Sequence, residues 1–158
     1  MAPKLVPWLK RMLIFPERHR ELRHYMLFKD LNAHELQLVH NYLHRREYAA
    51  GETVFEEGFP VEALYLIESG ELQITGIRDD HANRILKRHQ FVGVIDLFAQ
   101  SARLSTAAAH TELTVLAISQ EDFWELLRQH PALGVKILSA CGRFLAKYIV
   151  ENNTHSEV

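Results

Sequence analysis

Short apolar runs separated by turn residues characterise the middle of the chain. Residues 51–70, GETVFEEGFPVEALYLIESG, contain two such runs, and the alternating segment ELQIT follows directly. Apolar runs of this length, broken by glycine and other turn formers, are typical of short strands joined by tight turns. The pattern therefore predicts strands over residues 46–119, with a hairpin tip at the turn-forming run 79–83.

Helical periodicity precedes the strand region. Residues 17–44 predict two helices with a break near residues 29–32, and Asn32 and Glu35 have the spacing of a capping box at the start of the second helix. Residues 1–16 combine apolar side chains at helical spacing with lysine and arginine. For this segment we expect either a short helix packed on the domain or on a sister subunit, or an anchor for a partner or a membrane surface.

Two further helices are predicted after the strands. Ser119 is placed to cap a helix that ends before Pro131, and a final helix covers residues 132–150. Apolar side chains in the final helix are spaced three, four and three apart, at Leu138, Cys141, Leu145 and Tyr148. Ile137, Phe144 and Ile149 widen this apolar face. Two explanations are open: packing of one face on the β-roll alone, or such packing together with a homodimer formed through the helix.

The order of these elements predicts an α+β fold in which helices flank a β-roll, or jelly roll. The expected boundaries are an N-terminal helical segment at residues 1–27, the domain itself at residues 28–150 and a polar tail at residues 151–158. The interior of a β-roll suits a small polar ligand held among apolar walls.

Composition narrows the classes of function. The chain has 158 residues, a formal net charge of −2 and no long basic run, so direct nucleic-acid binding is not expected. No apolar run approaches the roughly 18–20 residues of a transmembrane helix. The single cysteine, Cys141, excludes an intramolecular disulfide and fits a reducing compartment, so a cytoplasmic location is expected.

Two stretches of the chain resemble the cyclic-nucleotide-binding domain family. The patterns G-E-x-V-F-x-x-G and L-Y-x-I-x-x-G-x-x-x-I, within residues 51–74, are similar to the first half of that domain. The segment FVGVIDLFAQSARLSTAAAHTELTVLAIS, residues 91–119, resembles its phosphate-binding cassette, where a short helix follows a glycine and an arginine comes about ten residues later. The resemblance covers about residues 28–130. It implies a catabolite-activator-like β-roll with N-terminal helices, a short cassette helix and C-terminal helices.

The resemblance also implies a site for cyclic AMP or cyclic GMP. In the family, backbone N–H groups at the start of the cassette helix and the arginine hold the cyclic phosphate, because helix N-termini and guanidinium groups both attract anions. The matching positions in this chain are Gly93, Val94, Ile95, Arg103 and Leu104. The final helix of the family contacts the purine, and the candidates for that contact are Ser139, Arg143 and Phe144.

The cassette departs from the family pattern where the ribose would bind. Val94 replaces the glutamate that accepts a hydrogen bond from the ribose 2′-OH, and Leu104 replaces a small residue. Losing such a bond weakens binding roughly tenfold to a hundredfold. Gln90 or Asp96 could take over the hydroxyl, and Asp96 is also the nearest acid available to Arg103. Both a retained nucleotide site and a pocket occupied by the chain's own side chains are therefore open.

Enzymatic activity is not expected. His40 and His44 are four residues apart in a helical stretch, but no third and fourth zinc ligands accompany them, and no nucleophile elbow or glycine-rich phosphate loop is present. No metal and no cofactor are expected. The sequence thus predicts a regulatory or sensor module that binds a cyclic nucleotide and relays this to a partner protein through its final helix. The alternative is a fold that no longer binds nucleotide and serves as a protein–protein interaction or scaffolding domain.

Overall fold

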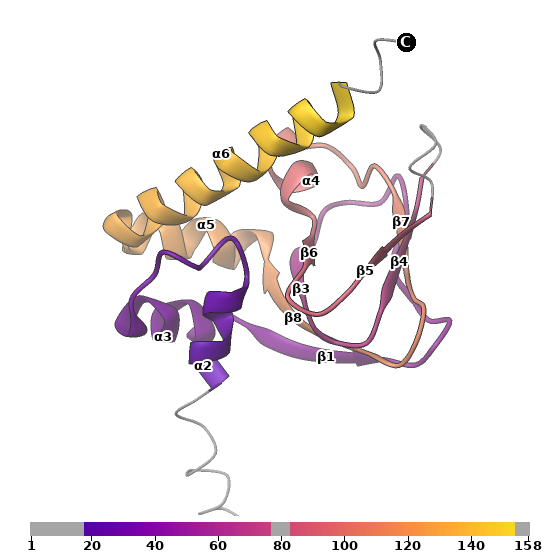
Figure 1. The fold of residues 1–158 in the computed structure, drawn as a ribbon, viewed down its shortest axis with the longest axis horizontal. Coiled ribbons are helices and arrows are strands. Elements are labelled where there is room, and N and C mark those ends of the chain that lie inside the picture. The colour runs from indigo at the N-terminus through magenta and orange to yellow at the C-terminus, as the bar shows by residue number, and fades with distance from the viewer. Residues whose placement is uncertain (1–17, 77–82, 154–158) are drawn as a thin grey trace, which may run out of the picture.

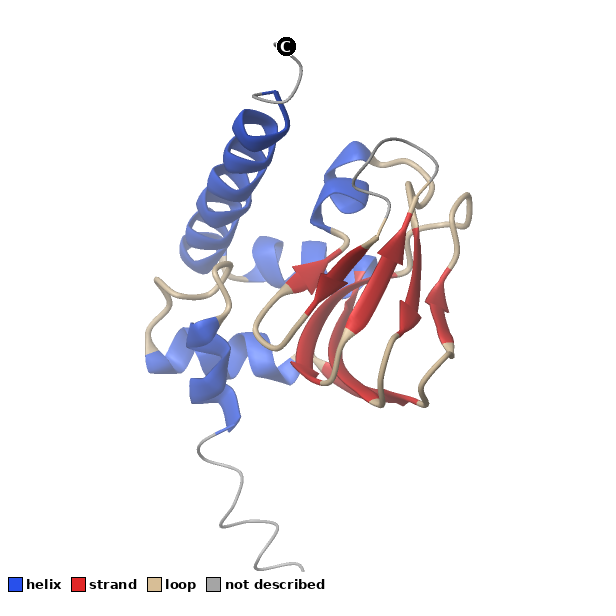
Figure 2. Ribbon diagram, turned by 45° about the vertical axis from the view of Figure 1, so that its right-hand side comes forward, coloured by secondary structure: helices blue, strands red, loops and turns tan. Residues whose placement is uncertain are grey.

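A layer of helices lies against one sheet of a two-sheet β-roll (Figure 1, Figure 2). The computed structural model of the chain describes residues 18–76 and 83–153. Outside this range lie the predicted helix within residues 1–16, residues 79–82 of the hairpin tip predicted at 79–83, and residues 154–158 of the tail predicted at 151–158. Within it, the predicted α+β fold is confirmed.

The elements follow one another in the predicted order. They are α2 (Arg18–Glu21), the 3₁₀ turn η1 (Leu22–His24), α3 (Ala33–Asn41), β1 (His44–Tyr48), β2 (Thr53–Phe55), β3 (Ala63–Ser69), β4 (Leu72–Thr75), β5 (Arg84–Leu86), β6 (Phe91–Val92), α4 (Val94–Ala99), β7 (Thr106–Ala109), β8 (Leu113–Ser119), α5 (Gln120–Gln129) and α6 (Pro131–Asn153). The predicted polar tail is thus helical as far as Asn153.

The strands form two antiparallel sheets. One has the order β1-β8-β3-β6 and the other β2-β7-β4-β5. In the first sheet, Tyr65 of β3 lies between Ala117 of β8 and Val92 of β6. Because β3 is internal to this sheet, both of its edges are hydrogen-bonded and its position is fixed on both sides.

Strand β3 separates two hydrophobic cores. Alternate side chains of a strand point to opposite faces of the sheet. Leu64 and Leu66 pack with the helices, whereas Ala63, Tyr65 and Ile67 pack in the interior of the roll. This two-sided burial explains why the segment is apolar at almost every position and does not alternate with polar residues.

The predicted helix caps are present. The Asn32 side chain accepts a hydrogen bond from the Glu35 N–H at 2.9 Å, and the Glu35 carboxylate accepts one from the Asn32 N–H at 2.8 Å. The Ser119 hydroxyl likewise accepts from the Asp122 N–H at 3.0 Å. The Glu35 carboxylate also accepts a hydrogen bond from the Lys136 ammonium of α6 at 2.8 Å, so this cap connects α3 to α6.

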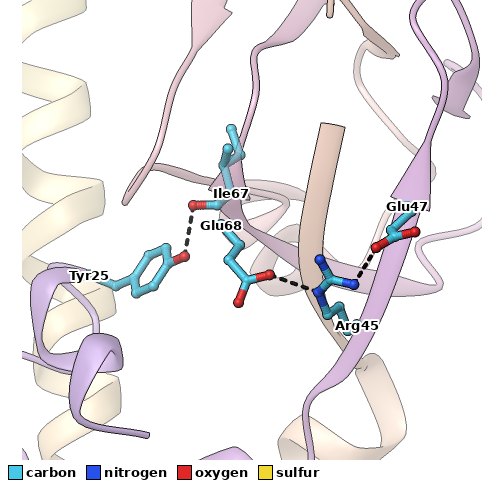
Figure 3. A network of polar contacts seen from close by, with 5 residues as sticks. All are labelled: Tyr25, Arg45, Glu47, Ile67 and Glu68. Atoms are coloured by element: carbon cyan, nitrogen blue, oxygen red, sulfur yellow. Dashed lines mark hydrogen bonds and ion pairs between the residues drawn. The ribbon is translucent and has the colours of Figure 1, made fainter. Parts of the chain in front are cut away.

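Tyr25 ties the helical layer to β3. Its hydroxyl donates a 2.7 Å hydrogen bond to the carbonyl of Ile67, and burial raises the pKa of this phenol (Figure 3). Nearby, Arg45 of β1 donates to Glu68 at 2.9 Å and to Glu47 (Figure 3). A buried hydroxyl without this carbonyl would cost about 1–3 kcal/mol, so the bond fixes how the helices sit on the sheet.

Cys141 interrupts the predicted seam of α6, whereas Leu138 of the same seam is exposed. Cys141 is fully buried in the core, where burial raises the pKa of its thiol to about 12. It packs there with Leu133 and Ile137, so it cannot form part of an exposed seam. The sequence alone did not distinguish the core-facing side of α6 from its exposed side, because the helix has apolar side chains on both. A 3-4-3-4 spacing runs through the exposed Val135, Leu138, Gly142 and Ile149 and through the half-buried Leu145, which also packs against the core. We call this set the outer α6 face.

Gly70 is a position where the fold requires glycine. Its φ is +82°, and a Cβ there would lie 2.0 Å from the carbonyl oxygen of Glu112. Gly51 has a similar φ of +89° but no atom within 4 Å of the corresponding point.

We predict that Gly51→Ala costs about 1–2 kcal/mol of unfolding free energy, for the left-handed backbone alone. Gly70→Ala should lower the free energy of unfolding clearly more than Gly51→Ala does. Equal losses for the two variants in urea unfolding would contradict the close approach of Gly70 to the Glu112 carbonyl.

Candidate functional site

The site is built around a glycine that leads into α4. Gly93 has a φ of +108° and is the N-cap of this six-residue helix. A Cβ at Gly93 would lie 2.9 Å from Nη1 of Arg103 and 3.2 Å from the carbonyl oxygen of Ala63. Glycine is therefore needed for its backbone conformation, and also because the Arg103 guanidinium passes directly across it.

Arg103 is buried, with only 2% of its surface exposed. Its Nη1 donates to Asp96 at 3.1 Å and its Nη2 donates to the carbonyl of Ala63 at 2.5 Å. The guanidinium carbon lies 4.0 Å from the ring centre of Phe55 and 5.6 Å from that of Tyr65. The cation is thus held by one carboxylate, one carbonyl and two aromatic rings.

The Asp96 carboxylate accepts hydrogen bonds from two donors of the cassette. Besides Arg103, it contacts the backbone N–H of Leu104, which donates to Oδ1 at 3.4 Å. The family resemblance assigns these two donors to the cyclic phosphate. The side chain of Asp96 is almost as buried as that of Arg103. The two charges therefore compensate each other inside the protein, and each would be costly to leave alone.

The backbone around Arg103 is also fixed. Its N–H donates to the carbonyl of Phe59 at 2.8 Å, and its carbonyl accepts from the N–H of Gly58 at 2.9 Å. Both partners belong to the turn between β2 and β3. Nε of Arg103 is buried and has no hydrogen-bond partner in the part of the chain that the structure describes. One donor of the guanidinium is therefore unused.

The side chains of the other predicted cassette residues point away from Arg103 or make other contacts. Val94, at the glutamate position, is buried in the core between the helices and the first sheet, while Ile95 is half-buried and the Leu104 side chain is exposed. The Gln90 side chain accepts from the N–H of Lys87 at 2.7 Å in the turn between β5 and β6. The structure thus brings Gly93, Asp96, Arg103 and the Leu104 backbone together, but not Gln90.

The candidate purine contacts on α6 are separated from one another. Ser139 is exposed, and Arg143 pairs with Asp30 at 2.7 Å in the segment before α3. The ring of Phe144 lies 4.9 Å from that of Phe91 in β6, the strand that leads into Gly93. Of the three, Phe144 is the residue that connects α6 to the cassette.

Three partners of Arg103 were not identified from the sequence. Phe55 and Tyr65 stack on each other at 5.9 Å, and Ala63 contributes only its carbonyl. Alternation along β3 could have placed Tyr65 inside the roll. No local signal pairs Phe55 with Arg103, because the two residues are brought together by the pairing of β2 with β7.

An open depression of about 750 Å³ reaches Asp96 from outside. Trp124 and Gln120 of α5 form part of its wall and also line a neighbouring depression of about 540 Å³. Neither Gly93 nor Arg103 lines either depression. The hollow surface therefore leads to the carboxylate and leaves the guanidinium covered. No group of three metal-ligating side chains occurs among residues 18–76 and 83–153.

Comparison with known proteins identifies the family. The family model described as the cyclic nucleotide-binding domain matches residues 45–130, more than half of the chain. The chain belongs to this family. The crystal structure of the N-terminal domain of a transcriptional regulator from Streptomyces coelicolor is similar, with a TM-score of 0.69 and 27% identity, over 81% of this chain and 94% of that one. The predicted family and the predicted β-roll are confirmed.

Two curated relatives are named for cyclic AMP. The cyclic AMP receptor protein of Thermus thermophilus is 27% identical over 128 residues, which are 79% of this chain and 59% of that protein. The cAMP-dependent protein kinase regulatory subunit of Pyricularia oryzae is 29% identical over 101 residues, 64% of this chain and 26% of that protein. The chain thus spans less than two thirds of the length of either relative. None of the helices that the structure describes has the length and apolarity to cross a bilayer.

The buried ion pair predicts a large effect on stability. Asp96→Ala leaves the Arg103 charge buried and uncompensated, and should lower the free energy of unfolding by about 3–5 kcal/mol. Asp30→Ala breaks the exposed pair with Arg143 and should cost less than about 1 kcal/mol. Combining Asp96→Ala with Arg103→Met should recover most of the loss. Urea unfolding measures all three, and a small effect of Asp96→Ala would show that the guanidinium is solvated in solution.

Proposed function

We propose that this domain is a non-enzymatic regulatory module whose phosphate-binding groups are held by its own Asp96. A cyclic nucleotide such as cyclic AMP or cyclic GMP would bind by replacing that carboxylate as the hydrogen-bond acceptor for the Arg103 guanidinium and the Leu104 N–H. The contact of Asp96 with both donors carries the proposal. Membership of the family and the cyclic AMP receptor protein among the relatives support the class of ligand.

The unused Nε of Arg103 supports an exchangeable site. A buried N–H without a partner costs free energy, which a ligand with more acceptor oxygens would recover. A phosphate has more acceptor oxygens than the carboxylate. The arginine would then gain hydrogen bonds on exchange while its charge stayed compensated throughout.

A second candidate is an interaction domain that has lost nucleotide binding. Val94 in place of the glutamate and the packing of Phe55 and Tyr65 against Arg103 favour it. In this case the ion pair is purely structural, and the function depends on the surface of the domain.

Isothermal titration calorimetry with cyclic AMP and cyclic GMP tests the proposal. We predict that the wild-type protein binds these nucleotides weakly, with a dissociation constant in or above the submillimolar range. Asp96→Asn keeps the shape of the side chain but removes the competing charge, and should bind at least about tenfold more tightly. Adding Arg103→Leu to this variant should abolish the gain.

The other outcomes are equally informative. No heat with either nucleotide for a folded Asp96→Asn protein would overturn the proposal in favour of the interaction domain. Micromolar binding by the wild type that weakens in Asp96→Asn would instead make Asp96 a ligand contact and would refute self-occupation. Thermal unfolding of each variant establishes that it is folded before the titration.

We infer further that a signal would reach α6 through Phe144. Phe144 contacts Phe91, and Phe91 pairs with Leu66 of β3, the strand that also supplies the Ala63 carbonyl to Arg103. A shift of Arg103 on ligand exchange would therefore act on a strand whose neighbour touches α6. The outer α6 face is the surface that would present the change to a second copy or to a partner protein.

The outer α6 face predicts a homodimer. Its 3-4-3-4 spacing is the repeat with which helices pack in pairs, and Gly142 at its centre permits close approach of a second backbone. We expect sedimentation equilibrium to show a dimer of the wild type. Leu138→Glu should shift the protein to the monomer. Phe59→Glu, at a residue that is 59% exposed on the β2–β3 turn, is the matched control and should remain dimeric. A monomeric wild type, or a dimeric Leu138→Glu variant, would refute this interface.

A further inference from the structure

Two depressions in the surface beside α4 and α5 meet at Trp124. The larger has a volume of about 750 Å³ and the smaller of about 540 Å³, and both have Trp124 and Gln120 in their walls. The larger reaches Asp96 of α4, and the smaller extends to Glu121 in the first turn of α5. Volumes of this size are typical of small-molecule sites. We call the joined hollow the α4–α5 groove.

The charged residues in the wall of the groove are mostly acidic. Asp96 is the one charged residue in the wall of the larger depression, and the smaller depression adds Glu62, Glu121 and Arg128. Arg103, the partner of Asp96, lines neither depression. Carboxylates therefore lie on both sides of an uncharged stretch of wall. An excess of negative charge in a hollow surface favours a cationic ligand over an anionic one.

Asp96 has acceptor capacity that its contacts within the protein leave unused. In the part of the chain that the structure describes, its carboxylate accepts from Nη1 of Arg103 at 3.1 Å and from the Leu104 N–H at 3.4 Å. An ionised carboxylate can accept about four hydrogen bonds. Asp96 is only 6% exposed, yet it forms part of the wall of the larger depression. A donor that enters the groove can therefore reach this carboxylate while Arg103 keeps its own contact.

The indole of Trp124 is a fixed apolar wall between the carboxylates. Its ring lies 5.5 Å from that of Phe98 in α4 and 5.1 Å from that of Phe123 in α5. Beside it, the Gln120 N–H donates to the Glu62 carbonyl at 2.9 Å, which holds the segment before β3 against α5. Trp124 is half-buried, so part of its surface remains available to a ligand. An aromatic ring of this kind packs against aliphatic groups and attracts cations.

We propose that the α4–α5 groove binds a linear aliphatic polyamine. One ammonium group would bind at Asp96 and another at Glu62 and Glu121, while the methylene groups between them pack against Trp124. A chain with a charge at each end matches carboxylates that are separated by an aromatic wall, whereas a single metal ion does not. Among residues 18–76 and 83–153, no three metal-ligating side chains are grouped together. The site does not depend on nucleotide binding at Arg103.

Isothermal titration calorimetry of the full chain with spermidine tests the proposal. We expect saturable binding that weakens when the salt is raised from about 0.05 M to about 0.5 M, because ions screen exposed charges. 1-Butylamine has a single ammonium group and should bind about fivefold or more weakly than spermidine. Equal affinity for 1-butylamine or for magnesium chloride, or no saturable heat with spermidine, would overturn the proposal.

Variants without the wall carboxylates locate the bound spermidine. E62Q/E121Q changes two exposed residues of the smaller depression and should weaken spermidine binding about fivefold or more. E52Q/E112Q makes the same change in net charge at exposed residues that line neither depression, and should bind like the wild type. Equal loss in the two double variants would mean that net charge alone governs binding. That result, or unchanged binding by E62Q/E121Q, would refute the groove as the site.

The fluorescence of Trp124 provides a second measurement. The chain has two tryptophans, Trp8 and Trp124, so W8F leaves Trp124 as the only one. Spermidine should change its emission over the same concentrations that produce heat, because the methylene groups cover the exposed part of the indole. W124L should weaken binding about fivefold or more, once thermal unfolding shows that this variant is folded. Heat without any change in the emission of W8F would place spermidine elsewhere and overturn the proposal.

Discussion

The buried charge of Arg103 is the constraint on which the site depends. A guanidinium this inaccessible must be compensated within the protein, since an isolated buried charge costs several kcal/mol or more. The compensation comes from three different elements: Asp96 from α4, the Ala63 carbonyl and Tyr65 from β3, and Phe55 from β2. Gly93 completes the arrangement, because any side chain at its Cβ would meet the guanidinium. The cassette is therefore held together by this one cation as much as by its own short helix.

Strand β3 extends this constraint to the rest of the molecule. Its inward side chains line the roll beside Arg103, its outward side chains pack under the helices, and its Ile67 carbonyl accepts the Tyr25 hydroxyl (Figure 3). The helical layer and the candidate site are thus fixed to opposite faces of the same strand. Such a strand cannot move on one side without disturbing the packing on the other, because protein interiors are close-packed. This is the physical basis for expecting α6 to sense the state of the cassette.

Local chemistry made much of the fold predictable. The caps at Asn32 and Ser119 depend on residues three positions apart, and the glycine and arginine of the cassette depend on a short spacing that resembles a known motif. Contacts that depend on the pairing of strands far apart in the sequence were harder to predict. Phe55 meets Arg103 only because β2 pairs with β7, and the Ala63 carbonyl carries no signal in the sequence. The prediction of a seam through Cys141 in α6 failed for a different reason. Apolar residues occupy both faces of that helix, so periodicity alone did not decide that Cys141 faces the core.

The exchange between Asp96 and a cyclic nucleotide is balanced in charge for Arg103 alone, because Asp96 would lose the cation that compensates it. A cyclic phosphate diester carries one negative charge, as does the carboxylate, so Arg103 gains no net charge compensation when one replaces the other. The carboxylate is also part of the chain, and its effective concentration at the site is far above that of a free ligand. A nucleotide must therefore obtain its advantage from contacts other than charge. The unused Nε of Arg103 offers one such contact, whereas Val94 removes the one that the family's glutamate makes with the ribose. What remains is the purine, whose contact would come from α6 near Phe144. Under the proposed function, the affinity for nucleotide would therefore depend on the position of α6, and the state of that helix and the occupancy of the site would depend on each other.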